Sequence, residues 1–416
     1  MNQKISNSIE RLNSEFTKRY GNEPEFIASA PGRVNLIGEH TDYNDGFVFP
    51  VAIDKYIHIA VQRRSDRKVQ LHAVDMREEC TFSLDHIDKD DTPQWAKYIK
   101  GVAHYLQELV LHDTRHVMNG LSAVITGDVP ISAGLSSSAA LEVASSYAFL
   151  AASGLAISNT INRNFGKIEL IEIPLMKLAA LCQRAENEFA GVNCGIMDQS
   201  ISLLGKADHA LFLDCRALDY KQVPLNLTNL QIVICNTNVK RELAASEYNK
   251  RRAECENGVQ ILKKWLPNIT SLRDVTLDEF KKYEVELPEI TQKRCRYVVE
   301  ENTRVLNAVD ALSKSDIETF GMLMNASHAG LRDLYEVSCD ELNMLTEIAQ
   351  NINGVLGSRM TGAGFGGCTV NLVRTEVVDE LRTNVMREYT KQTGIKPDIY
   401  VCNVGDGARI NWISQS

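Results

Sequence analysis

The sequence has no apolar run long enough to cross a membrane, although it contains 416 residues. A spanning helix needs about 20 consecutive apolar residues. The longest candidate, between Ala139 and Leu155, is interrupted by Glu142 and by serines. A secretory signal peptide is also lacking. These absences argue against a membrane partner and predict a soluble, cytoplasmic protein.

An excess of basic residues is lacking too. The chain carries 45 Lys and Arg against 54 Asp and Glu, a formal net charge of −9. The basic residues are scattered, whereas a protein that binds a duplex concentrates them on one face. The sequence therefore excludes nucleic acid as a partner.

Paired cysteines are the third absence. The ten cysteines are widely spaced, and no Cys-x-x-Cys pair occurs among them. This spacing argues against a zinc ribbon or a disulfide framework. It predicts reduced thiols in a cytosolic protein.

What the chain does contain is material for two cores. Apolar residues make up 44% and charged residues 24% of the sequence, which are ordinary globular values. A chain of this length exceeds the usual limit for one core, so we expect two domains with a cleft between them. We place them at 1–215 and 216–416, with a boundary between 205 and 225, and we expect the last strand to pack back on the first domain.

Hydrophobic periodicity predicts an α+β order without a regular βαβ rhythm. Alternation is clearest between Phe47 and Gln62, where a hairpin or meander is expected after a strand at Phe26 to Ala30. Further strands are predicted at 68–74, 80–84, 121–126, 209–214, 231–235, 368–373 and 398–404, and helices at 8–19, 94–111, 138–152 and 175–189, in much of the region after 246, and again up to about 392.

A cluster of hydrogen-bonding side chains follows the first strand. Arg33, Glu39, His40 and Asp42 lie within ten positions of one another. Carboxylates and an imidazole suit a ligand with many hydroxyls, such as a sugar. The arginine instead matches phosphate or carboxylate oxygens. We interpret the segment as a polar binding surface.

A loop of small residues, Ser132 to Ser138, precedes a predicted helix. Free N–H groups and the positive dipole end make such a helix start suitable for phosphate. No Gly-Lys pair continues as a Walker loop requires. Gly362 to Gly367 fits the dinucleotide spacing, but a strand follows where a helix is needed. An ordinary capped helix remains the alternative for Ser132 to Ser138.

Two carboxylates, Glu186 and Asp198, flank a glycine-bearing segment. Phosphoryl transfer needs charge neutralisation and a group that accepts or orients the hydroxyl proton. The pair could divide those tasks, although isolated carboxylates are more often solvated surface charges.

Three motifs carry a resemblance to a known family. The run Gly32 to Asn44, Gly-Arg-Val-Asn-Leu-Ile-Gly-Glu-His-Thr-Asp-Tyr-Asn, resembles the galactokinase signature, within the superfamily that groups galactokinase with homoserine, mevalonate and phosphomevalonate kinases. The segments around 130–142 and 360–370 are similar to that family's phosphate loop and third motif. The resemblance covers most of the chain.

The resemblance implies a two-domain small-molecule kinase. It implies an N-terminal mixed sheet with helices, a C-terminal antiparallel sheet with helices, and an active site in the cleft. The implied reaction is MgATP-dependent phosphorylation of the C1 hydroxyl of α-D-galactose, the first committed step of galactose metabolism. Galactose and ATP are then the small-molecule partners, Mg²⁺ is the cofactor, and a monomer is favoured.

By the same resemblance, Asp198 is the catalytic base and Arg33 stabilises developing charge. Whether Asp198 removes the proton or only orients the hydroxyl stays open, because a nearby arginine makes proton acceptance harder. Glu188 is a second candidate beside Glu186 for the metal carboxylate. The implied sugar contacts are Glu39, His40, Thr41, Asp42, Gly195 and Tyr248; the implied ATP contacts are Ser132, Ala133, Gly134, Leu135, Ser136, Ser137 and Ser138; the implied metal ligands are Ser138 and Glu186.

Two alternatives are weighed against this interpretation. N-acetylgalactosamine kinases resemble galactokinases closely, but Thr41 after the Glu-His pair favours plain galactose. Galactose-sensing co-inducers bind both ligands without turnover and lack a Ser-Ala pair in the phosphate loop, whereas Ser138 and Ala139 form that pair here.

Overall fold

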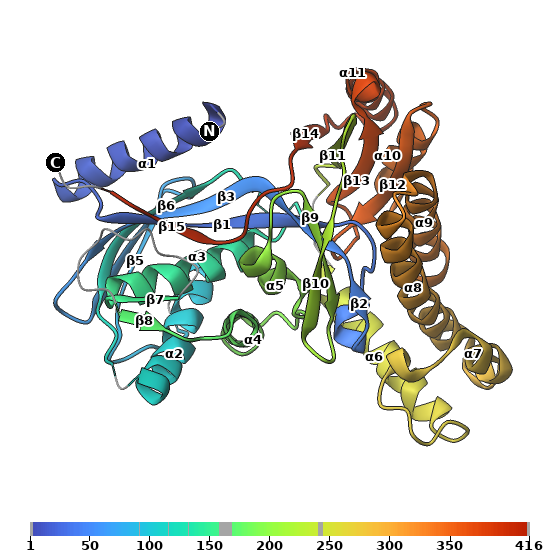
Figure 1. Ribbon diagram of the computed structural model, residues 1–416, viewed down its shortest axis with the longest axis horizontal. Coiled ribbons are helices and arrows are strands. Elements are labelled where there is room, and N and C mark those ends of the chain that lie inside the picture. The colour runs from blue at the N-terminus through green and yellow to red at the C-terminus, as the bar shows by residue number, and fades with distance from the viewer. Residues whose placement is uncertain are drawn as a thin grey trace.

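A computed structural model describes residues 3–90, 92–114, 116–131, 133–157, 169–239 and 244–413. The chain forms two regions, each built around a β-sheet that helices cover (Figure 1). The first region carries a mixed sheet and the second an antiparallel sheet, as expected for the fold class.

The first sheet has the strand order β15-β1-β3-β6-β4-β5. Only β4 and β6 run parallel, and the other pairs are antiparallel. Its strands are β1 Phe26–Asn35, β3 Pro50–Arg63, β4 Lys68–Ala73, β5 Glu78–Ser83, β6 Leu121–Gly127 and β15 Arg409–Trp412.

Helices cover both faces of this sheet, which explains why β3 is buried along most of its length. On one face α1 (Gln3–Tyr20) places Leu12 and Phe16 against Ala60 and Val124. On the other face Ile59 belongs to the large core that also contains α3. The period-2 alternation of β3 therefore separates two apolar faces rather than an apolar face from a polar one.

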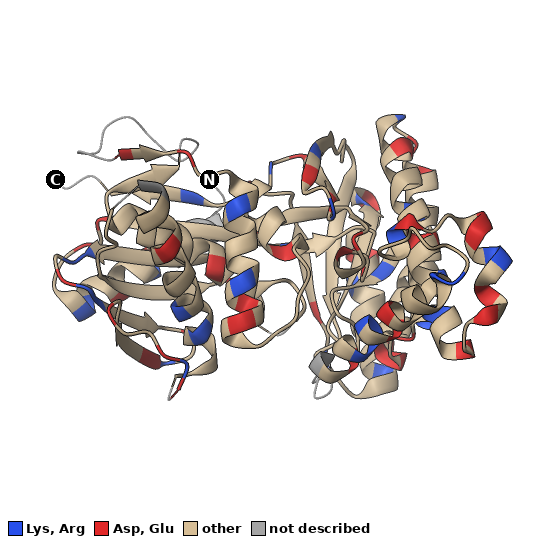
Figure 2. Cartoon of the chain, turned by 90° about the horizontal axis from the view of Figure 1, so that it is seen from below, with Lys and Arg blue, Asp and Glu red and all other residues tan. Residues whose placement is uncertain are grey.

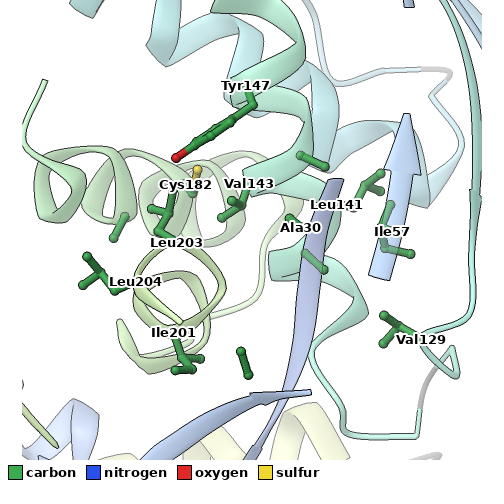
Figure 3. Packing of buried hydrophobic residues seen from close by; sticks show 14 of the residues in the cluster. Ala30, Ile57, Val129, Leu141, Val143, Tyr147, Cys182, Ile201, Leu203 and Leu204 are labelled. Atoms are coloured by element: carbon green, nitrogen blue, oxygen red, sulfur yellow. The ribbon is translucent and has the colours of Figure 1, made fainter. Parts of the chain in front are cut away.

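Helix α3, Ser137–Ala152, is the centre of the first region, and every residue from Ala139 to Ala152 is buried. It packs against β1 and β3 and against other helices. Figure 3 shows Val143 and Tyr147 directed toward Cys182 and Leu203. The helices that pack around it are α2 Gln94–Thr114, α4 Leu175–Arg184 and α5 Met197–Leu204, with a π-helical turn, Ala185–Ala190, after α4.

The second sheet has the order β12-β13-β11-β14 and is antiparallel throughout. Helices α9 and α10 pack on β12, and α6 and α8 pack on each other. These elements are β11 Leu230–Asn236, β12 Val355–Thr361, β13 Cys368–Arg374, β14 Asp398–Cys402, α6 Ala244–Leu262, α7 Leu277–Tyr283, α8 Glu289–Ser313, α9 Ile317–Gly330, α10 Asp340–Gln350, α11 Val378–Asn384 and α12 Thr390–Thr393.

Two smaller sheets are also present among the described residues. One connects β2 (Phe47–Val48) with β9 (His209–Asp214) and β10 (Asp219–Pro224). The other pairs β7 (Leu155–Ile157) with β8 (Glu169–Ile171) in parallel.

Several elements differ from the sequence-based expectation. The first strand does not end at Ala30 but continues through Pro31 and Gly32 to Asn35, because β3 pairs with it on both sides of a bulge. The short strands β7, β8, β10, β12 and β15 were not predicted. Of these, β15 pairs with β1, a partner distant in the sequence, whereas the other four pair with a segment nearby in the sequence. After β14 the chain returns to the first region, where β15 pairs with β1.

The charges are mixed in sign. Figure 2 shows Lys and Arg interspersed with Asp and Glu over the face in view, most densely on the helices of the second region. All ten cysteines lie in the described ranges and are thiols. No helix in the part of the chain that the structure describes is long and apolar enough to cross a membrane.

Candidate active site

A cavity of about 580 Å³ brings the sequence motifs together. One wall comes from the end of β1, the loop after it and the start of α3. The opposite wall comes from α6 and from the turn that joins β12 to β13. The lining is polar where these segments meet and apolar farther away, where Trp95, Tyr98 and Ile125 contribute.

The charged pair at the polar end is Arg33 with Asp198. Nε and Nη2 of Arg33 each donate to one carboxylate oxygen of Asp198 at 2.8 Å, and Nη1 donates to the carbonyl of Gly134 at 2.6 Å. Burial alone would lower the pKa of Arg33, but Asp198, followed by Glu39, outweighs it and raises that pKa above its ordinary value. Arg33 is therefore a fixed cation that orients Asp198.

The loop before α3 also contacts Asp198. Ser136 has a left-handed backbone (φ 60°), and its hydroxyl donates to Asp198. Gly134, Ser136, Ser137 and Ser138 line the cavity. Of the other expected ATP contacts, Ala133 and Leu135 are buried in the core and Ser132 lies outside the described residues.

The hydroxyl-binding set predicted from the sequence divides into two groups, and the first lines the cavity. His40 and Asp42 lie beside Gly195 and Tyr248 there. Nδ1 of His40 is 2.8 Å from the Tyr43 hydroxyl, and its Nε2 is buried without a hydrogen-bond partner among the described residues. Burial lowers the pKa of His40 to about 3, so the imidazole is neutral. A neutral ring with a free nitrogen suits a hydroxyl ligand.

Asp42 has an unusual environment. Burial, and then the charge of Asp198, raise its pKa to about 7. Gly195 packs so closely on Asp42 that a Cβ there would overlap the carboxylate. Asp42 can therefore change its protonation near neutral pH while its position is fixed by its neighbours.

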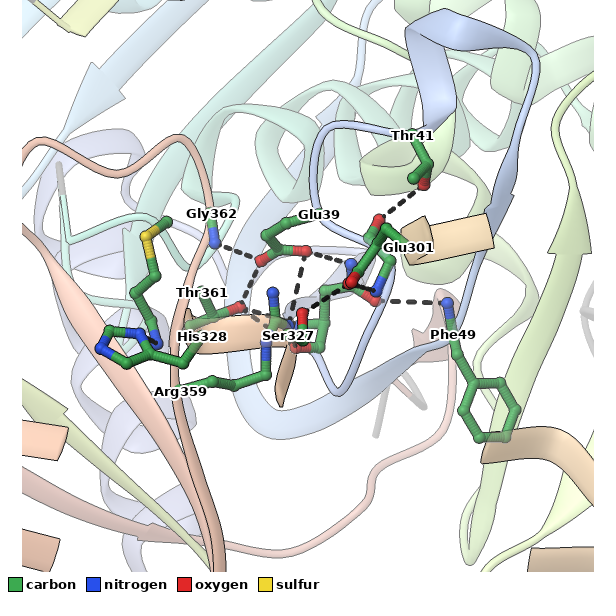
Figure 4. A network of polar contacts seen from close by, with 12 residues as sticks. Glu39, Thr41, Phe49, Glu301, Ser327, His328, Arg359, Thr361 and Gly362 are labelled. Carbon is green, nitrogen blue, oxygen red and sulfur yellow. Dashed lines mark hydrogen bonds and ion pairs between the residues drawn. The ribbon is translucent and has the colours of Figure 1, made fainter. Parts of the chain in front are cut away.

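The second group lies behind the lining. Glu39 accepts from Thr361 Oγ1 at 2.9 Å and from the Gly362 amide, and its other oxygen accepts from Asn35 (Figure 4). The Thr41 hydroxyl lies 2.8 Å from the Gly38 carbonyl and 2.6 Å from the Phe47 carbonyl. Neither residue lines the cavity, and Thr41 supports the loop from inside.

Glu186 and Ser138 face each other on the cavity wall. Burial together with Asp198 raises the pKa of Glu186 to about 7, and the nearby Ser138 hydroxyl opposes that rise. Glu188, the second candidate, lies on the other side of the π-helical turn and accepts from Tyr105 and Arg184. The structure therefore separates the two candidate carboxylates.

Sequence reasoning missed two residues that lie behind this wall. Gln199 donates to Glu186 at 2.7 Å and to Glu142 at 2.9 Å. Glu142 is completely buried on α3. In the sequence this glutamate only interrupts an apolar run, and no local pattern indicates that it lies near Glu186.

Comparisons with known proteins agree with this geometry. Residues 14–63 match the galactokinase galactose-binding signature, residues 97–206 match the N-terminal domain of GHMP kinases, and residues 308–391 match their C-terminal domain. Those three segments include Arg33, Ser138 and Asp198 and the turn after β12.

The chain is similar to whole proteins as well. It is 48% identical to a galactokinase of Roseiflexus sp. over 396 residues, which cover 95% of each chain. It is 45% identical to a galactokinase of Chloroflexus aggregans over 407 residues, covering 98% of this chain and 99% of the other. The crystal structure of Lactococcus lactis galactokinase complexed with galactose superimposes with a TM-score of 0.87 at 36% identity, covering 96% of this chain and 99% of that one. Methanococcus jannaschii mevalonate kinase shares the fold, with a TM-score of 0.59 at 20% identity.

Proposed function

The chain belongs to the galactokinase family, and from that premise we propose roles for the residues of its cavity. It is an ATP-dependent sugar kinase that phosphorylates galactose at the C1 hydroxyl. The observation that carries the proposal is the Arg33–Asp198 pair, which lies where the phosphate loop meets the hydroxyl-binding wall.

Galactose is proposed to bind against His40, Asp42, Gly195 and Tyr248. The free Nε2 of His40 and the carboxylate of Asp42 offer hydrogen bonds to ring hydroxyls. Glu39 stays in this proposal as a support of the sugar site, because its carboxylate accepts hydrogen bonds from Asn35, Thr361 and Gly362 behind the lining. Thr41 does not, since its hydroxyl is engaged within the loop.

The phosphates of ATP are proposed to lie over Gly134, Ser136, Ser137 and Ser138. The start of α3 lies at that part of the cavity, and the unpaired backbone N–H groups and dipole of a helix start favour anions. The apolar lining from Trp95, Tyr98 and Ile125 is the proposed position of the adenine base.

Asp198 is proposed to act on the C1 hydroxyl. Because Arg33 holds it with two charge-assisted bonds and Ser136 adds a third, its position is fixed before substrate binds. Orientation of the attacking hydroxyl is its first contribution. Asp198 then accepts the proton of the C1 hydroxyl as negative charge develops in phosphoryl transfer, and Arg33 stabilises that charge.

Ser138 and Glu186 fit the cation that accompanies the nucleotide. Mg²⁺ prefers hard oxygen ligands and takes one or two carboxylates together with substrate phosphates. Among the described residues no group of three His, Cys, Asp or Glu gathers as an all-protein metal cage. One hydroxyl and one carboxylate on the same cavity lining, from Ser138 and Glu186, match this smaller requirement. When bound, the cation would neutralise phosphate charge.

The remaining expectations stay proposals. Two domains, 1–215 and 216–416, with β15 joined to the first, are consistent with the two sheets. A cytoplasmic location is proposed from the ten thiols, which persist in a reducing compartment.

A coupled ADP-release assay with a panel of monosaccharides tests the function. We expect turnover with galactose and much lower kcat/KM with N-acetylgalactosamine, because a pocket fitted to the C2 hydroxyl should reject the bulkier acetamide. ADP release that is the same with and without galactose would contradict the proposal, as would equal kcat/KM for the two sugars.

A further inference from the structure

A carboxylate, an amide and a second carboxylate form a chain behind the cavity wall. The side-chain nitrogen of Gln199 donates to Oε2 of Glu186 at 2.7 Å and to Oε2 of Glu142 at 2.9 Å. An amide nitrogen has two hydrogens, so each carboxylate can receive one. Gln199 is thereby fixed from both sides.

The position of Glu142 is costly for folding. Its side chain is completely buried between Leu141 and Val143 on α3, and its Oε1 has no hydrogen-bond partner among the described residues. Oε1 of Gln199 is in the same condition. Burying polar atoms without partners destabilises a fold, and an apolar residue would cost less. A role in the neighbouring active site, and not in core packing, therefore explains why a glutamate stands at this position.

The hydrogen-bonded series Glu142–Gln199–Glu186 connects three elements of the structure, each of which supplies a residue of the site. Glu142 lies on α3, the helix that begins beside Ser138; Glu186 lies on the π-helical turn; and Gln199 follows Asp198 on α5. Gln199 and the Cys194 thiol donate hydrogen bonds to Glu186, and the Ser138 hydroxyl lies close enough to lower its pKa. Of these three, Gln199 is the one that a buried carboxylate holds from behind.

We propose that Glu142 and Gln199 are positioning residues that hold the Glu186 carboxylate toward Ser138, so that the site binds the divalent cation of its cation–nucleotide substrate. The proposal rests on the function proposed for Glu186 and Ser138. Outer residues that orient a metal ligand typically change metal affinity by about 10- to 100-fold when they are replaced.

The test measures Mn²⁺ binding to the full chain with a non-hydrolysable ATP analogue, from the electron paramagnetic resonance signal of free Mn²⁺. Glu142→Leu and Gln199→Leu should each weaken Mn²⁺ binding by about 10- to 100-fold. The double variant should be no weaker than the worse single variant, because both changes break one chain. Galactose affinity, measured without nucleotide, should stay within about twofold in all three, since the chain touches no proposed sugar contact.

The conservative variant separates positioning from packing. Glu142→Gln keeps an acceptor for Gln199 and should restore most of the Mn²⁺ affinity that Glu142→Leu loses. Ser145→Ala is the matched control on the same helix, because that buried hydroxyl donates to the Leu141 carbonyl within the helix. It should leave Mn²⁺ binding unchanged.

Several results would overturn the inference. Unchanged Mn²⁺ binding in Gln199→Leu would do so, and so would additive losses in the double variant. A parallel loss of galactose affinity would indicate a general folding role. Glu186→Gln distinguishes failure of the metal site from failure of the positioning role. If Glu186→Gln binds Mn²⁺ normally, the proposed metal site is wrong. If Glu186→Gln loses Mn²⁺ but the Glu142 and Gln199 variants do not, only the positioning role fails.

Discussion

The guanidinium of Arg33 and the carboxylate of Asp198 meet in a two-point contact, with both nitrogen-to-oxygen distances at 2.8 Å. The two residues are 165 positions apart, and Asp198 keeps 23% of its side chain exposed to the cavity while Arg33 keeps 6%. The arginine is therefore the fixed support, and the aspartate is the group that a ligand can reach.

Asp198→Ala should fold normally and lose turnover. Removing the group that orients the hydroxyl and accepts its proton should lower kcat by about 10³-fold. The measurement is steady-state ADP release with galactose, with circular dichroism as the folding check. Asp198→Asn keeps the shape and an oxygen for Arg33, and it should be similarly slow. A near-normal rate in either variant would remove Asp198 from the mechanism.

Arg33→Lys should reduce kcat by about 10- to 100-fold, because an ammonium cannot make two parallel bonds to one carboxylate. The KM for galactose should change little, since no proposed sugar contact is altered. Arg63→Lys is the control: Nε and Nη2 of Arg63 both contact Oε2 of Glu25 near the surface, and exposed pairs contribute little. If both lysine variants behave alike, the geometry of the Arg33 pair is unimportant for catalysis.

Galactose binding should strengthen as pH rises through about 7. Burial and Asp198 raise the pKa of Asp42 to about 7, so below that value the carboxylate is protonated and has lost acceptor capacity. Between about pH 6 and about pH 8 the ionised fraction increases about tenfold, and affinity should follow. Calorimetry without nucleotide or cation isolates this effect from Glu186.

Asp42→Asn should give a flat affinity profile over the same range. A profile in the variant as steep as the parent's would assign the titration to another group.

The stability of the free protein should depend on pH in the opposite direction to galactose affinity. The folded state holds the Asp42 proton more tightly than the unfolded chain does, because the pKa of an aspartate in an unfolded chain is the ordinary 3.8. Stability of the free protein should therefore fall as pH rises from about 4 toward about 7.

Ser136→Ala and Ser136→Gly should both lower kcat by about tenfold, because each removes the hydroxyl that donates to Asp198. The glycine variant also relieves the left-handed backbone at this position. A loss shared by both variants therefore belongs to the hydroxyl. Full activity in either one would show that Arg33 alone positions Asp198.

The sequence predicted the motif residues better than their surroundings. Arg33, Ser136 and Asp198 were expected at one site because each belongs to a contiguous motif, and all three line the cavity. Glu39 was also part of a motif, but its carboxylate turns away toward Thr361 and Gly362 at the end of β12. That direction depends on a partner more than 300 residues away, so no local pattern could indicate it.

Isolated buried polar residues were beyond sequence reasoning. Glu142 stands alone in an apolar helix, and the fully buried Arg359 is one basic residue in a short strand. The Nη1 of Arg359 donates to the Asn35 carbonyl and lies 3.8 Å from Glu39 (Figure 4). Their significance comes from tertiary contacts. The same reason explains the missed strand β15, which pairs with the distant strand β1. It does not explain β12, which pairs with β13, the next strand along the chain.

The return of β15 to β1 has a consequence for synthesis of the protein. β1 carries Arg33, yet among the described residues its outer edge is covered only by 409–412. While a ribosome is still translating the chain, that edge stays open, and an uncovered strand edge can pair with another polypeptide. The enzyme must therefore keep its nascent amino-terminal half from aggregating until residues 409–412 have been synthesised.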